Sequence, residues 1–460
     1  MLVQPKVSDM EQLTPHKEGG IKEVLHISYP LMISYLSGYL MLFIDRLILA
    51  RFSNEAMNAA ATIGLVCYVF DYGLIGITAI VEVFVGKLNG ARDFTRMGEP
   101  VWQAIWLCLF SFLLCVPLAF WGSKLLVPTI YQSIGTNYYF ISMISCPFFG
   151  LAAALGAFFI GQGRGYFVTI AVIISNVINL ILALILVFGF WIFPRLGLQG
   201  AAVATLFAQV IQVVILAGIF FSKRNRAKYG CAIWRFNYKI FKNLLNIGLP
   251  NSLSHVLEIS AWALVAQMLA TVNNEQVTLF SLGQSLFILF AFFSEGLQKG
   301  VMAISSNFIG AKKYHLISKN LISATYVHMV FCLILLLALM INSNAVVKMF
   351  FPSEELVHLF DLANINCFWV LLCFTLEGLA WIRSAILTSV GDVKFIMVVN
   401  VISVVVFAVL PIYVLIIRTN GALMISSWQL ICMSSMINFL IFSYRSKRKI
   451  AGIPERGYCT

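Results

Sequence analysis

Six carboxylates lie inside stretches that are otherwise apolar enough to cross a membrane: Asp45, Asp71, Glu82, Glu258, Glu295 and Glu377. Holding a charged side chain in hydrocarbon costs at least about 2.5 to 3.5 kcal/mol. Acids kept at that cost usually face a wet cavity or a partner and take part in ion or proton movement. The chemistry that these residues indicate is therefore reversible binding of a proton or a metal cation.

Asp45 and Arg46 are neighbours within one such stretch, YLMLFIDRLILARF at 39–52. Adjacent helical residues point about 100° apart, so the two side chains do not pair on one helix face. Arg46 is long enough to carry its charge to the membrane interface, whereas the short side chain of Asp45 is not. Asp45 must therefore be protonated, bind a cation or meet a partner within the protein, which is the profile of an ion or proton site.

Glu258 and Glu377 also stand apart from bases. Glu258 follows Pro250 by eight residues in GLPNSLSHVLEISAW, and Glu377 lies in the middle of WVLLCFTLEGLAW. Neither has a Lys or Arg within one helical turn, although Arg383 lies six residues beyond Glu377. Each is either a protonated carboxyl that is hydrogen-bonded to a neighbouring helix or half of a paired cation site, and we favour the cation site.

The other three acids are less informative. Glu82 lies close to Lys87 at the end of its stretch, which suits a position at the membrane rim as well as a functional one. Glu295 and Lys299 have the i, i+4 spacing at which two side chains neutralise each other on one helix face. We therefore predict a structural pair there. Asp71 has no base nearby, and the sequence leaves its role open.

The elements that position these acids are predicted to be membrane-spanning helices. Of the 460 residues, 60% are hydrophobic and 11% are charged, whereas roughly a quarter of the residues of a soluble domain are charged. Apolar runs of about 20 residues, enough to cross a hydrocarbon core of roughly 30 Å, predict an all-α polytopic membrane protein with twelve spans. They fall at residues 24–49, 58–86, 101–121, 137–160, 166–190, 198–221, 241–270, 277–309, 320–341, 357–389, 395–417 and 421–443.

Lys and Arg residues are sorted by side of the membrane. With twelve spans, most of the 31 lie in the terminal segments and in the loops on the same side, with seven of them between 222 and 242. The positive-inside rule then places both termini in the cytoplasm. We expect a multi-pass protein of the bacterial inner or plasma membrane, in which the lipid bilayer rather than a nucleic acid accounts for the net charge of +12.

No catalytic or structural-metal pattern accompanies the acids. The ten cysteines are scattered, without a CxxC spacing, so we expect them to fill small apolar spaces. The six histidines show no HExxH spacing, and there is no GxxxxGK[ST] loop for ATP. We therefore predict that the protein is not an enzyme and that it has no cofactor beyond a coupling ion.

The chain contains an internal duplication. ISYP at 27–30 matches IGLP at 247–250, and IVEVFVGKLNGARD at 80–93 matches GVMAISSNFIGAKK at 300–313, both at an offset of 220 residues. Six spans per copy is an even number, so the second copy begins on the same side of the membrane as the first. The copies are therefore parallel and related by a pseudo-two-fold axis along the membrane normal.

This duplication predicts the domain organisation. We expect two six-helix lobes joined by a basic cytoplasmic segment, with a cytoplasmic leader at 1–23 and a cytoplasmic tail. The N-terminal lobe is predicted at 1–221, the linker at 222–240 and the C-terminal lobe at 241–460. Two parallel repeats of this kind are typical of transporters that work by alternating access.

The order of these motifs resembles the MATE (multidrug and toxic compound extrusion) family. Pro30 followed fifteen residues later by Asp45 is similar to the family's first-helix pattern, and GLPNSLSHVLE resembles its seventh-helix segment. Glu377 in LEGLAWIRSAILTSVGD is placed as an acid of the NorM-like branch, and LGLQGAAVATLFAQ at 196–209 resembles the sixth-helix segment. The resemblance covers nearly the whole chain.

The resemblance implies a twelve-helix antiporter that exports organic, often cationic, compounds by using a gradient of Na⁺ or H⁺. By position, Asp45 would be the coupling acid of the first lobe. Glu258 and Glu377 would form the cation site of the second lobe, where we favour Na⁺.

The fifth span, SNVINLILALILVFG, completes the implied first-lobe site and departs from the family at one point. Asn176 and Asn179 are candidates to line the cavity, but Ala183 stands where some branches have a second acid. This departure shifts the expected coupling toward the acids of the second lobe.

Other functions are weighed against this one. A lipid-linked oligosaccharide flippase of the same superfamily would also have two duplicated lobes, but its pyrophosphate group calls for more bases in the spans than Arg46, Lys299 and Arg383. Uptake by a nucleotide exchanger is a further alternative, and a purely structural role leaves the isolated acids unexplained. In each transport function the partners are a small-molecule substrate and the lipid bilayer. We expect the protein to be a monomer.

Overall fold

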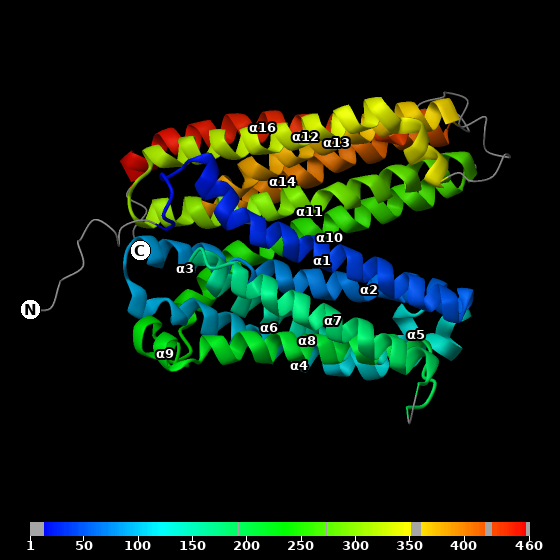
Figure 1. Ribbon diagram of the computed structural model, residues 1–460, viewed down its shortest axis with the longest axis horizontal. Helices are drawn as coiled ribbons and strands as arrows, with labels where there is room; N and C mark the ends of the chain where they lie inside the picture. The colour runs from blue at the N-terminus through cyan, green and yellow to red at the C-terminus, as the bar shows by residue number, and fades with distance from the viewer. Residues whose placement is uncertain (1–12, 191–192, 273, 351–359, 419–425, 457–460) are drawn as a thin grey trace, which may run out of the picture. The chain divides into compact units, whose positions relative to one another are not determined.

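The computed structural model describes residues 13–190, 193–272, 274–350, 360–418 and 426–456. In these residues the chain forms helices and turns and no strand (Figure 1). Eleven helical segments of the described chain are long and apolar enough to cross a membrane. The predicted all-α polytopic fold is therefore confirmed.

The first repeat contains six of these segments. Three of them, Asn54–Gly90, Phe94–Trp121 and Thr129–Gly161, contain more than one helix. The elements are α1 (Ile21–Phe52), α2 (Asn54–Thr78), α3 (Val81–Gly90), η2 (Phe94–Arg96), α4 (Gly98–Trp121), α5 (Ser123–Leu126), η3 (Thr129–Tyr131), α6 (Gln132–Gly161), α7 (Tyr166–Phe188) and α8 (Leu198–Phe220). A short helix, α9 (Lys223–Tyr229), follows within the linker.

The second repeat supplies the other five segments. They are α10 (Tyr238–Ala270), α11 (Asn274–Gly310), α12 (His315–Phe350), α13 (Phe360–Ser389) and a segment made of α14 (Val393–Val404), η5 (Val405–Val409), α15 (Leu410–Ile412) and η6 (Tyr413–Ile417). The last helix of the described chain, α16 (Ser427–Arg456), is not among the eleven. The twelfth predicted span, 421–443, coincides with α16 from Ser427 onward, and its first residues lie outside the described part of the chain.

Two prolines lie inside the first helices of the two repeats, at matching positions. Pro30 is within α1 and Pro250 is within α10. Proline has no N–H group to continue the helical hydrogen bonding, but membrane helices tolerate it when neighbouring groups satisfy the freed carbonyl. Both helices continue past the proline toward the acids, Asp45 in α1 and Glu258 in α10.

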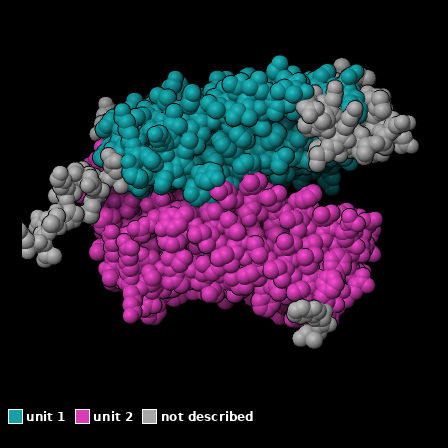
Figure 2. Space-filling model, viewed as in Figure 1, with its two compact units in different colours: residues 1–32, 257–308, 313–460 teal, residues 33–256, 309–312 magenta. Residues whose placement is uncertain are grey.

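The chain forms two compact units, which Figure 2 colours separately. Unit 1 contains the described residues up to Met32, Leu257–Phe308 and those from Lys313 onward, and unit 2 contains Ile33–Val256 and Ile309–Lys312. The first helix of each repeat is thus divided between the units, shortly after its proline. Asp45 belongs to unit 2, and Glu258 and Glu377 belong to unit 1.

Each unit has its own apolar core. In unit 1 the fully buried Trp428 of α16 packs with Phe280 of α11 and Phe374 of α13. In unit 2 one cluster surrounds Tyr139 of α6, and a second surrounds Phe158 of the same helix. Each cysteine in the described part of the chain is free and buried, as the scattered spacing predicted.

Candidate ion-coupling site

Asp45 lies on the part of α1 that packs against α7 in unit 2. The side chain of Asn179, on α7, hydrogen-bonds the Asp45 carboxyl group. Asn179 is buried, and its Oδ1 atom and the Oδ1 atom of Asp45 are both buried without a hydrogen-bond partner in the described structure. The two polar side chains therefore meet in a setting where Asp45 has acceptor capacity to spare.

Two further hydrogen bonds join α1 to α7, and their α1 residues precede Asp45 in the helix. Asn176 donates from Nδ2 to Ser37 Oγ at 2.8 Å, and Ser34 donates from Oγ to Thr169 Oγ1 at 2.9 Å. Hydrogen bonds between side chains of membrane helices stabilise their association by about 0.6 kcal/mol on average. Together they fix the rotation of α1 so that Asp45 faces α7. The sequence identified Asn176 and Asn179, but it did not identify Ser37, the partner of Asn176, or the separate pair of Ser34 and Thr169.

The neighbours of Asp45 differ from it in environment. Arg46 is exposed, whereas Asp45 is half-buried, which is the separation that helical geometry requires. Ala183 lies one turn beyond Asn179 and is fully buried in the apolar core. The methyl group of Ala183 packs where a second first-lobe acid was considered, so this part of α7 offers no carboxylate.

Glu258 of α10 and Glu377 of α13 both belong to unit 1. The charge of Glu377 acts on Glu258 through space. The side chain of Glu377 hydrogen-bonds Ser435 of α16 and Trp381 of its own helix. Two helices that are far apart in sequence, α10 and α13, thus each contribute one acid to the same group.

Glu295 of α11 joins this group, because its charge also acts on Glu258. The sequence did not indicate this neighbourhood. The signal that it contained, a lysine four residues from Glu295, pointed instead to pairing with Lys299, and that pair stays a prediction. No regularity of spacing on α11 relates Glu295 to an acid on α10, so only the tertiary packing reveals the proximity.

Arg383, the base nearest to Glu377 in sequence, is held elsewhere. Its Nη1 atom donates to the backbone oxygen of Leu379 at 2.8 Å, and its guanidinium carbon lies 4.5 Å from the centre of the Phe439 ring. A stacked arginine of this kind is stabilised by the ring and a carbonyl rather than by a carboxylate.

His328 on α12 was not singled out by the sequence, although it lies beside Glu377. Its ring is fully buried, with Nδ1 3.3 Å from Ser294 Oγ and Nε2 3.1 Å from the backbone oxygen of Thr375. A Cβ atom at Gly378 would collide with the ring. Glycine at 378 therefore allows α12 to approach α13 directly next to the acid.

The remaining acids are both buried. Asp71 of α2 hydrogen-bonds the Cys146 thiol of α6, and its Oδ1 atom has no partner in the described structure. Glu82 of α3 is also buried within unit 2. Its side chain is covered by the packing of α6 against α3, and the choice between a rim role and a functional one stays a prediction.

The donor atoms at the unit 1 acids are oxygens. Two carboxylates and the Ser435 hydroxyl are ligands of the kind that hard cations prefer. In the described residues no three His, Cys, Asp or Glu side chains converge as a metal-binding group. A cation at Glu258 and Glu377 would thus take the rest of its ligands from hydroxyl, carbonyl or water oxygens.

Comparison with known proteins gives a consistent assignment. The family model described as MatE matches residues 30–185 and 250–414. The "Probable multidrug resistance protein YoeA" of Bacillus subtilis is 23% identical over 344 residues, which cover 72% of this chain and 72% of that protein. The "Probable multidrug resistance protein NorM" of Bradyrhizobium diazoefficiens is 25% identical over 275 residues, 56% of this chain and 57% of that protein.

The fold is shared with solved structures. A crystal structure described as MATE in complex with MaL6 superimposes with a TM-score of 0.85 at 16% identity, covering 98% of this chain and 100% of that one. The matched family regions begin at Pro30 and Pro250 and include Asp45, Glu258 and Glu377. The chain therefore belongs to the MatE family of membrane transporters.

Proposed function

We propose that the protein is a secondary active antiporter that exports organic, often cationic, compounds in exchange for Na⁺ or H⁺. The proposal is supported by membership of the MatE family and by relatives named as multidrug resistance proteins. We further propose that it acts as a monomer in the plasma membrane with both termini in the cytoplasm. In this proposal the half-buried acids Asp45, Glu258 and Glu377 supply the coupling.

The proposal is supported by the presence of Glu258 and Glu377 in the same unit, where the charge of Glu377 acts on Glu258. Two carboxylates that share a buried site destabilise each other when both are ionised. A cation or a proton bound there relieves the repulsion, so the site binds it without a permanent basic partner. Arg383, which could have supplied that partner, is held by Phe439 and Leu379.

Coupling follows if the acids have different affinities for the ion in the inward-open and outward-open states. An ion shifts an equilibrium only by its differential affinity, and a tenfold difference corresponds to about 1.4 kcal/mol. A carboxylate that holds a cationic substrate by charge loses that attraction once Na⁺ or H⁺ is bound to it. Exchange of ion for substrate at the acids is thereby linked to the change of state.

Asp45 has a related role in unit 2. Its side chain is hydrogen-bonded by Asn179, and Ala183 leaves that part of α7 without a second acid. We propose that Asp45 holds one proton or cation during the cycle. Among the coupling ions we favour Na⁺, because the larger group of acids, with its oxygen ligands, lies around Glu258.

Transport by purified protein in lipid vesicles tests this function. A fluorescent organic cation is loaded into vesicles, and its release is followed after a Na⁺ gradient is imposed at constant pH, and then after a pH gradient is imposed in Na⁺-free buffer. We expect release driven by the Na⁺ gradient and absent with a choline gradient. Failure of both gradients to drive release would contradict the antiporter assignment.

A further inference from the structure

The linker between the two repeats carries positive charge that the described structure does not neutralise. Residues 222–242, SKRNRAKYGCAIWRFNYKIFK, contain seven Lys and Arg residues and no Asp or Glu. All seven side chains are exposed. In the described residues no carboxylate forms an ion pair with any of them.

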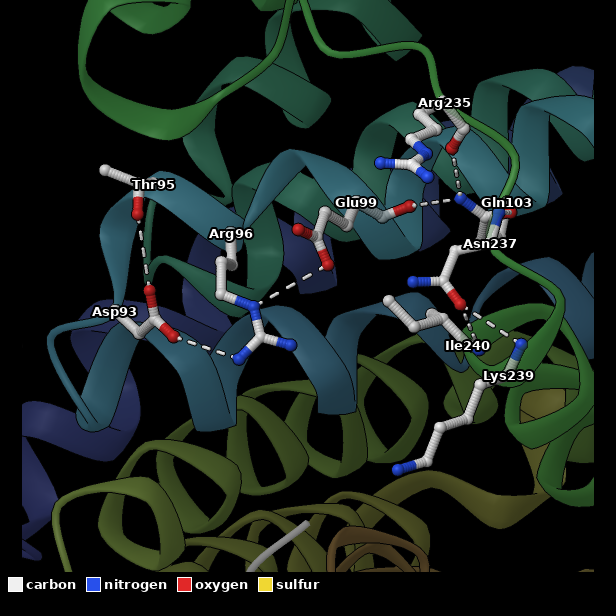
Figure 3. Close-up of polar contacts among 9 residues, drawn as sticks. All are labelled: Asp93, Thr95, Arg96, Glu99, Gln103, Arg235, Asn237, Lys239 and Ile240. Atoms are coloured by element: carbon white, nitrogen blue, oxygen red, sulfur yellow. Dashed lines mark hydrogen bonds and ion pairs between the residues drawn. The ribbon is translucent and has the colours of Figure 1, made fainter.

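The acids nearest to the linker are already paired. Asp93 lies before α4, and its carboxylate is 3.4 Å from Arg96 (Figure 3). Glu99 lies in the first turn of α4, and its carboxylate is 3.7 Å from Arg96 (Figure 3). Among the residues drawn in Figure 3, no contact reaches the guanidinium group of Arg235 or the ammonium group of Lys239. These two bases are therefore available to an anion from outside the protein.

One buried side chain holds the linker in place. Gln103 of α4 is fully buried, and its Nε2 atom donates to the backbone oxygens of Glu99 and Arg235, each at 3.1 Å (Figure 3). Its Oε1 atom accepts from the backbone N–H of Asn237 at 3.0 Å. The amide of Gln103 thus fixes the backbone on both sides of Phe236, and with it the direction of the Arg235 side chain.

Two tryptophans of α4 add to this attachment. Trp102 donates from Nε1 to the backbone oxygen of Cys231 at 2.9 Å, and Trp106 donates to that of Trp234 at 3.2 Å. Gly230, with φ +62°, has no room for a Cβ atom against the Thr95 backbone. The linker is therefore an ordered surface, and a ligand would not have to order it on binding.

Aromatic and aliphatic side chains lie beside the bases. Trp234 is 65% exposed and Tyr238 is 68% exposed, and Ile233 is exposed between them and the buried Cys231. The Trp234 and Trp106 rings lie 6.4 Å apart, and Phe236 and Phe241 lie 5.2 Å apart. Trp and Tyr favour the interface between lipid and water, where one end of the ring is apolar and the other is hydrated.

We propose that the linker surface that carries Trp234, Arg235, Tyr238 and Lys239 binds the headgroups of anionic phospholipids. Arg235 and Lys239 each contact a lipid phosphate, and the exposed rings enter the interfacial region of the bilayer. The linker is joined directly to the membrane-spanning helices α8 and α10, so this surface lies at the bilayer. Exposed apolar rings at that depth favour a lipid over a soluble acidic protein or a free phosphate ion.

Lipid protection of the purified protein tests the proposal. Thermal unfolding in an uncharged detergent is followed while phosphatidylglycerol, phosphatidylcholine or inorganic phosphate is titrated. We expect phosphatidylglycerol to stabilise the protein more than phosphatidylcholine does, and inorganic phosphate to have no comparable effect. The double variant Arg235→Gln with Lys239→Gln should weaken the apparent affinity for phosphatidylglycerol by about fivefold for each base removed.

Three variants serve as comparisons. Lys447→Gln with Arg448→Gln removes two exposed bases of the tail, and should leave the affinity unchanged. Gln103→Leu keeps every charge but releases the linker, and should weaken binding. Trp234→Ala removes a ring that is 65% exposed and leaves the hydrogen bond from Trp106 to the backbone oxygen of residue 234 in place, and it should weaken binding as well if Gln103→Leu does not fold.

Three results would contradict the lipid-binding proposal, each in a different way. Equal losses in the linker and tail variants would mean that diffuse charge, not this surface, attracts the lipid. Equal protection by inorganic phosphate would assign the bases to a free anion, and equal protection by both lipids would exclude headgroup recognition. Because the measurement involves no transport, its failure leaves the antiporter function untouched.

Discussion

At the scale of single residues, the predicted cation site depends on three acids, Glu258, Glu377 and Glu295. The charges of Glu377 on α13 and Glu295 on α11 both act on Glu258 of α10, and Glu377 also has Ser435 as a hydrogen-bond partner. Repulsion among carboxylates favours any cation that enters, and oxygen ligands favour a hard one. The arrangement therefore makes a direct prediction about Na⁺.

NaCl should stabilise the purified protein, and the same concentration of choline chloride should not. Binding to the folded state alone adds about 2.7 kcal/mol of stability when the Na⁺ concentration is 100 times Kd. The measurement is the melting temperature in detergent as a function of salt. Glu258→Gln should abolish the Na⁺-specific rise, whereas Asp93→Asn, which removes a carboxylate outside the spans, should retain it. Equal stabilisation by both salts in the parent protein would count against a Na⁺ site.

The sequence predicted which acids are of interest and predicted that Glu258 and Glu377 belong together. It did not predict that Glu295 lies near them. Asp45, Glu258 and Glu377 stand out because each is a charge in an apolar run without a base one turn away. Glu295 has such a base, so its local pattern indicated a helix-surface pair and concealed its position near Glu258. His328 lies beside Gly378 through helix packing, which leaves no trace in local spacing.

At the scale of elements, close approach of helices depends on small residues. Without a hydrophobic driving force between helices, membrane proteins associate through close packing. In unit 1, Gly283 of α11 faces the buried Trp428 of α16, whose indole donates to the backbone oxygen of Phe280 at 3.2 Å. A side chain at 283 has no space.

Gly283→Val should therefore destabilise the protein by about 1 to 3 kcal/mol, the usual cost of overpacking. The Cβ atom alone would collide with the Trp428 ring. Gly218→Ala in α8 is the matched control, because nothing lies within 4 Å of a Cβ atom built there. Melting temperatures in detergent distinguish the two, and similar values for both variants would show that α11 and α16 do not pack closely at Gly283.

The helices themselves were largely predictable, and the reason is physical. Backbone groups in hydrocarbon must be satisfied within a helix, so each long apolar run can adopt only one structure. The attachment of residues 230–237 to α4 was not predictable, because it rests on Trp102, Gln103 and Trp106 reaching backbone oxygens far along the chain. The sequence showed only a basic linker.

At the scale of the whole molecule, the sequence repeat and the two compact units divide the chain at different places. The repeat, read from matches at an offset of 220 residues, gives two sets of six spans. The compact units instead divide α1 and α10 internally, close to Pro30 and Pro250. Asp45 belongs to unit 2, and Glu258 and Glu377 belong to unit 1. If these acids couple transport, as we propose, transport should require acids in both units.

Neutralising the acids during gradient-driven transport tests this account most directly. Asp45→Asn, Glu258→Gln and Glu377→Gln are compared with Asp93→Asn as control, in vesicles loaded with a fluorescent organic cation and matched for protein content. We expect each of the three variants to insert normally and to lose about tenfold or more of the gradient-driven rate, which corresponds to about 1.4 kcal/mol of differential ion binding, while the control transports at the parent rate. Transport at the parent rate by all three variants would contradict the assignment of coupling to these acids.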